Sequence, residues 1–231
     1  MWVFPLTAAG VSFVFAGMLG RRWALQRRGY QGMWVIALVM YGVASLALAL
    51  GTLSGWSEAS YRLYWLFGAV LNVPYLAQGE LMLLSRRRVL VNSFMGLLLA
   101  GTTIATWAIL SDPVDPAALD KAIPLGKEAF GTDSVAYRMA QMFAYPAYLY
   151  LVVASIWSAV RMRGRPELRN RSVGAVWIAV GATVVAVGSG AGAFWNLAWL
   201  FSLGLAVGIA MMFWGFLRAS RPAVAEGDSE V

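Results

Sequence analysis

The stretch Gly-Met-Trp-Val-Ile-Ala-Leu-Val-Met-Tyr-Gly-Val-Ala-Ser-Leu-Ala-Leu-Ala-Leu-Gly, residues 32–51, contains no charged side chain. A helix of about 20 residues rises by about 30 Å, which is the thickness of the hydrocarbon core of a bilayer. Similar apolar runs recur along the chain, which has 231 residues, 60% of them hydrophobic and only 13% charged. Because a soluble domain is far less apolar, the sequence predicts an all-α membrane protein.

The apolar runs predict a bundle of seven transmembrane helices that occupies residues 1–221. We expect the spans at about 2–19, 32–51, 62–84, 89–110, 137–160, 173–193 and 195–217. The junction between the last two is ambiguous, because Ser-Gly-Ala-Gly-Ala at 189–193 is compatible with a tight turn or with a kink. The acidic tail, residues 222–231, is expected to be disordered.

The basic residues alternate with the spans. Of the 18 Lys and Arg residues, 14 fall in the segments expected on one side: Arg21, Arg22, Arg27, Arg28, Arg86, Arg87, Arg88, Arg161, Arg163, Arg165, Arg169, Arg171, Arg218 and Arg221. The positive-inside rule therefore predicts an external amino terminus and a cytoplasmic carboxyl terminus in the cytoplasmic (inner) membrane. It also explains the net charge of +7 without a nucleic-acid partner. The expected partners are membrane lipids, other membrane subunits or a second copy of the chain.

The chain contains no Cys and no His. No thiolate can act as a nucleophile, the usual ligands of zinc and haem are missing, and no catalytic or metal-binding residue can be named. A bound lipid, quinone or other apolar molecule is compatible with this composition. The long connection at 111–134 carries five acidic residues and three prolines, and the sequence is compatible with either an ordered cap or a mobile flap.

The third expected span is the most informative segment. At helical spacing Tyr64, Gly68, Asn72, Tyr75 and Gly79 share one face, with Gln78 at its border. One interpretation is a ligand site in the middle of the membrane, formed with two tyrosines of the fifth span: Asn72, Tyr75, Gln78, Tyr145 and Tyr148. Pro74 and Pro146 would bend the two helices beside it. The other interpretation is ordinary hydrogen bonding between helices.

Two further features are each open to two interpretations. Glu80 is the only acid inside a span, which marks a functional candidate, but Arg86 to Arg88 are near enough to pair with it. The last two spans carry glycines at spacings of about four residues, which permits close packing or dimerisation: Gly181, Gly188, Gly192, Gly204 and Gly208.

A weak internal repeat suggests a 3+1+3 plan, in which two parallel three-helix units are joined by one inverting helix, 89–110. Arg28 and Trp34 match Arg171 and Trp177 at one constant offset. The same comparison pairs Phe4-Pro5 with Tyr145-Pro146, and Trp65-Leu66-Phe67 with Trp199-Leu200-Phe201.

Parts of this pattern resemble three known families. The seven spans and the sequence Arg62-Leu-Tyr-Trp resemble the microbial rhodopsin plan, but the seventh span lacks the lysine that forms the retinal Schiff base, since Lys121 and Lys127 both lie in the outer loop. The 3+1+3 plan is similar to SWEET sugar transporters, whose proline-glutamine pattern is not matched. The run 64–74 and the ending Met212-Phe-Trp-Gly-Phe216 resemble a family of uncharacterised actinobacterial-type seven-helix integral membrane proteins. That resemblance implies the fold and no activity.

The sequence therefore predicts a non-enzymatic polytopic membrane protein, with a ligand-binding or sensory role or a place as accessory subunit of a membrane complex. One alternative is a small-solute transporter, which would be favoured by the repeat and by the two proline-containing helices. The other is an intramembrane enzyme, which without His or Cys would have to use Glu80, Tyr or Asp in roles that no spacing supports.

Overall fold

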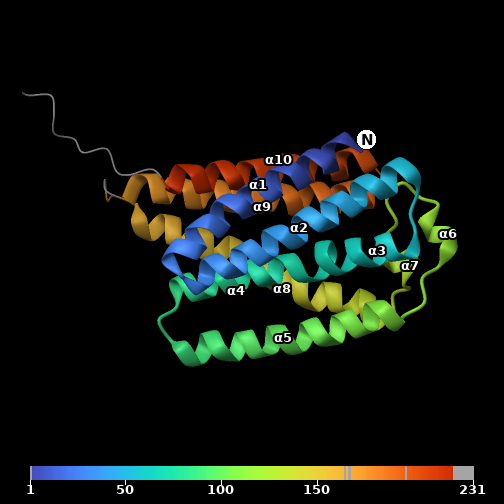
Figure 1. Cartoon of the computed structure of the whole chain (residues 1–231), viewed down its shortest axis with the longest axis horizontal. Coiled ribbons are helices and arrows are strands. Elements are labelled where there is room, and N and C mark those ends of the chain that lie inside the picture. The colour runs from blue at the N-terminus through green and yellow to red at the C-terminus, as the bar shows by residue number, and fades with distance from the viewer. Residues whose placement is uncertain (1, 164, 166–167, 196, 221–231) are drawn as a thin grey trace, which may run out of the picture.

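The computed structural model describes residues 2–163, 165, 168–195 and 197–220, and within them every regular element is a helix (Figure 1). The tail that was expected to be disordered lies outside the described residues. The long helices are α1 (Val3–Gln26), α2 (Gly29–Ser54), α5 (Arg88–Ser111), α8 (Val135–Met162), α9 (Arg169–Phe194) and α10 (Ala198–Ala219). Each is long and apolar enough to cross a membrane, so the prediction of a helical, multi-pass membrane protein is confirmed.

The third expected span has a different form from the others. Residues 58–84 are helical throughout but divide into α3 (Glu58–Tyr64), the π-helix η1 (Trp65–Leu71) and α4 (Asn72–Leu84). None of these pieces is long enough on its own to count as a membrane-spanning helix. The count of seven spans therefore stays a prediction, as does the 3+1+3 repeat.

The π-helical turns of η1 precede Asn72 and Pro74, at which the α-helical pattern of hydrogen bonds is interrupted. Pro74 has no N–H to donate to the carbonyl four residues earlier, and the backbone N–H of Asn72 bonds to Phe67 O, five residues back. The Asn72 side chain donates to Gly68 O at 2.8 Å, so its amide finds a partner within the same helical segment.

Helix α4 and the long helices other than α5 form a closed ring. Helix α1 packs on α2 and on α10, α2 packs on α4, α4 on α8, α8 on α9, and α9 on α10. Helix α5 lies outside this ring at one edge of the bundle, against α4 and α8 (Figure 1). Its buried residues form a single stripe, as expected for a helix with neighbours on one side only: Leu98, Gly101, Ala105, Ala108 and Ile109.

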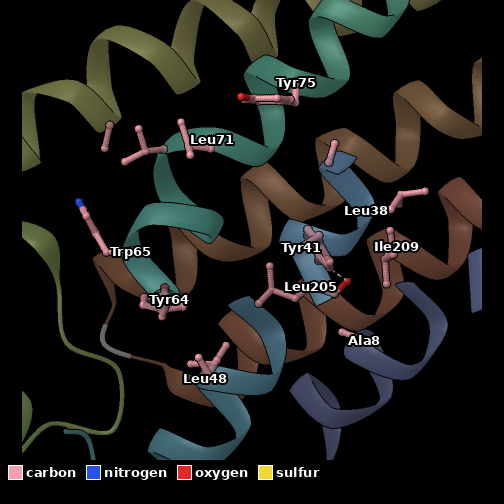
Figure 2. Packing of buried hydrophobic residues seen from close by; sticks show 14 of the residues in the cluster. Ala8, Leu38, Tyr41, Leu48, Tyr64, Trp65, Leu71, Tyr75, Leu205 and Ile209 are labelled. Carbon is pink, nitrogen blue, oxygen red and sulfur yellow. Dashed lines mark hydrogen bonds between the residues drawn. The ribbon is translucent and has the colours of Figure 1, made fainter. Parts of the chain in front are cut away.

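Side chains from different helices meet in the interior of the bundle. Figure 2 shows Tyr41 pointing from α2 towards Leu205 of α10, and its hydroxyl donates to the Leu205 carbonyl at 2.9 Å. Ser12 of α1 similarly donates to Leu38 O of α2 at 2.7 Å. Since hydrocarbon offers no partner to a hydroxyl, these bonds satisfy polar groups that the bundle buries.

Helices α9 and α10 approach each other through glycines. A Cβ atom on Gly188 would lie 2.7 Å from Gly204 Cα, and one on Gly181 would lie 2.6 Å from Gly208 O. The tight turn considered for 189–193 does not form there, because α9 continues to Phe194, and Gly188 and Gly192 pack against α10.

The segment 112–134 forms an ordered cap over one end of the bundle. It contains two short helices, α6 (Pro116–Leu119) and α7 (Gly126–Ala129), and its Phe130 packs 5.6 Å from Tyr61 and 5.9 Å from Trp65 between ring centroids. Trp56 donates to Ala122 O at 3.1 Å. We call this the capped end, and the opposite end, which carries the arginines of the turns after α1, α4 and α8, the basic end.

Candidate functional site

The three polar residues of the third expected span are buried, and each forms a hydrogen bond within the protein. Asn72 bonds within its own helix, Tyr75 lies 3.3 Å from Thr102 Oγ1 of α5, and Gln78 donates to Val91 O of α5 at 3.1 Å. Two of the three therefore connect α4 to the helix outside the ring. The Gln78 Oε1 atom is buried without a hydrogen-bond partner among the described residues.

Tyr145 and Tyr148 of α8, the other two residues of the predicted site, lie elsewhere. Tyr148 donates to Thr183 Oγ1 of α9 at 3.4 Å, whereas Tyr145 is 67% exposed on the outer surface of the bundle. The structure thus places the five residues in different surroundings and does not bring them together around one cavity. Their role in ligand binding stays a prediction.

Glu80 is buried in α4, with 8% of its surface exposed. Within the described part of the chain it forms no ion pair with Arg86, Arg87 or Arg88, which are exposed at the basic end. The expected pairing is therefore absent there. Tyr150 of α8 lies within electrostatic reach of the Glu80 carboxyl group.

A groove with a volume of about 720 Å³ lies between α4 and α8. We define it by its lining residues: Leu81, Leu84, Ser85, Pro146, Leu149, Tyr150, Val153, Ala154 and Trp157. A second hollow, of about 430 Å³, lies between α9 and α10. Nearly all side chains of the α4–α8 groove are apolar, which suits a hydrocarbon chain.

The groove opens towards the surface that faces the bilayer. Leu149, Val153 and Trp157 in its wall are 63%, 57% and 51% exposed. From Pro146 to Trp157 the wall runs along 11 residue steps of α8, or roughly 17 Å at 1.5 Å per residue. This is close to half of the 30 Å hydrocarbon core, so the groove has the length of one leaflet.

Polar groups gather at the end of the groove that lies nearest the basic end. Ser85 follows the last turn of α4 and is succeeded by exposed Arg86. On the other wall the guanidinium carbon of Arg161 lies 5.2 Å from the centroid of the Trp157 ring, a distance at which a cation is attracted to an aromatic face. The groove is thus amphipathic, apolar along its length and cationic at one end.

Sequence reasoning missed the groove because its wall consists of ordinary apolar residues. Trp157 and Arg161 stand four residues apart at the end of a span, where they share one helix face. That spacing was the available signal, although tryptophan and arginine near a membrane interface are common on their own.

No protein-family model, curated protein or solved structure matches this chain.

Proposed function

We propose that this chain is a non-enzymatic, ligand-binding membrane protein, and that its ligand is an apolar molecule that enters the α4–α8 groove sideways from the bilayer. The observation that carries the proposal is the groove itself, which is apolar, about 720 Å³ in volume and flanked by exposed Leu149, Val153 and Trp157. A volume of this size falls in the range of small-molecule sites.

The position of the groove supports entry from the membrane. Its open side is formed by residues of α8 that project from the ring, and α5 packs on α4 and α8 at the neighbouring surface. Pro146 belongs to the lining, and because proline cannot donate to the preceding turn, α8 can bend there to accommodate a guest.

The proposal is tested by purifying the protein in a mild detergent and identifying co-extracted molecules by mass spectrometry. We expect a lipid or quinone in a fixed ratio to the protein. Val153→Trp places an indole in the groove from an exposed position and should remove that molecule.

The matched control is Val187→Trp, at a residue of α9 that is 61% exposed and outside both hollows. It should retain the molecule. Equal retention by the two variants would show that the groove is not the binding site.

A small-solute transporter is the second candidate, and the arrangement of the helices favours it. In each half of the chain the middle helix packs on both of its neighbours, α2 on α1 and α4, and α9 on α8 and α10, while α5 lies outside. Two similar units joined by an outer helix would suit alternating access. If residues 3–84 fail to superpose on 135–219 within about 5.4 Å, one helical turn, this alternative loses its support.

A further inference from the structure

We propose that the occupant of the α4–α8 groove is an anionic phospholipid, held by an acyl chain along the apolar wall and by its phosphate at Arg161. This inference rests on the proposed function and adds the chemical class of the ligand. Such a lipid requires an apolar groove for its acyl chain and a cation for its phosphate, and different residues supply the two.

The length of the groove suits one acyl chain. Its wall extends for roughly 17 Å along α8, close to the depth of one leaflet. Leu81 and Ala154 form part of its buried lining, and Leu149 and Val153 line its open side. An acyl chain in this groove exchanges its contacts with bilayer lipid for contacts with the protein, and it buries no polar group of its own.

The charge at the mouth of the groove selects the headgroup. Arg161 is exposed and rests against Trp157, which lines the groove, so its charge is positioned where the chain would end. Exposed Arg86 follows Ser85 on the opposite wall. A planar guanidinium can donate two hydrogen bonds to one phosphate, which favours recognition of this group.

No carboxylate neutralises this end among the described residues. The three ion pairs within the described part of the chain all lie towards the capped end: Arg62 with Glu58, Lys121 with Glu128, and Arg138 with Asp133. Among the described residues Arg161 contacts the Trp157 ring and forms no ion pair. Clusters of basic residues beside spaces between membrane helices are suited to acidic headgroups.

The test measures binding of phosphatidylglycerol and phosphatidylcholine with identical acyl chains to the full-length protein, by native mass spectrometry at equal concentrations. We expect phosphatidylglycerol to bind more tightly. Arg161→Gln should lower its affinity about fivefold, the effect of one arginine near an anionic surface, and leave phosphatidylcholine unchanged.

Arg21→Gln is the charge-matched control, because Arg21 is exposed near the end of α1, which packs on α2 and α10. It should behave as the wild type. Equal affinity for the two lipids, or an equal loss in the two arginine variants, would overturn the inference.

The variant Val153→Trp distinguishes a wrong headgroup assignment from a wrong assignment of the groove as the binding site. If it removes both lipids although the wild type shows no headgroup preference, the groove binds lipid and only the choice of headgroup is wrong. If it removes neither lipid, the groove is not the site and both proposals fail.

Discussion

The Asn72 side chain forms a hydrogen bond within its own helical segment, and this determines the effect that we expect from its replacement. Its side chain donates to Gly68 O at 2.8 Å inside the π-helical region. We predict that Asn72→Leu lowers the stability of the protein by about 1 kcal/mol, the usual effect of one lost hydrogen bond, without changing the amount of co-purified lipid. Thermal unfolding in detergent and lipid analysis measure the two effects. Loss of the co-purified lipid with unchanged stability would instead indicate that Asn72 belongs to a ligand site.

Gly188 permits the contact between α9 and α10, since a Cβ atom there would lie 2.7 Å from Gly204 Cα. We predict that Gly188→Leu lowers stability by about 1 to 3 kcal/mol, the range for overpacking a close contact. Gly190→Leu is the control, because Gly190 lies on the same helix with nothing within 4 Å of its Cβ position. A comparable loss of thermal stability in both variants would mean that the close contact of Gly188 with α10 is not responsible, since leucine favours a helix more than glycine does.

At the scale of elements, the cap over 112–134 is held through a glycine. Gly126 lies against Trp65, and a Cβ atom on it would overlap the indole ring. We predict that Gly126→Leu detaches the cap, which limited proteolysis or hydrogen exchange of this segment would detect. Lys127→Leu introduces the same side chain at the neighbouring, exposed residue and should leave the cap protected. Equal protection of both variants would contradict the proposed attachment.

The helices were predictable from the sequence because lipid requires long apolar segments and every buried backbone group must be satisfied within them. Their ends were less accurate. Helix α1 continues to Gln26, past Arg21 and Arg22, because long arginine side chains can extend into the interfacial region while their backbone stays helical. The division of 58–84 was not predictable from apolarity, since it depends on local bonds such as that between Asn72 and Phe67 O.

The candidate site was predicted less well than the helices. Asn72 and Gln78 are buried, as polar groups in hydrocarbon should be, but burial does not identify their partners. Gln78 reaches Val91 and Tyr75 reaches Thr102, both on α5, whose position outside the ring is a property of the tertiary structure. The groove wall is mostly apolar, and its leucine, valine and alanine residues are of kinds that recur along the whole sequence.

At the scale of the whole molecule, the absence of native cysteine allows the topology to be measured directly. We predict that Ser54→Cys reacts with an impermeant maleimide in intact cells, and that Arg87→Cys reacts only after the cells are opened. These exposed residues stand on either side of the segment 58–84. Labelling of both from the same side would show that this segment does not cross the membrane, which would leave six spans in place of the predicted seven.

The glycine contact between α9 and α10 has a consequence for biosynthesis. A backbone approach as close as that of Gly188 to Gly204 is available only when both helices are present, and the chain reverses between Phe194 and Ala198. We expect the translocon to release α9 and α10 into the bilayer as one helical hairpin. A nascent chain truncated after α9 would present an unpartnered glycine face to lipid, and such a fragment should be a preferred substrate of membrane quality-control proteases.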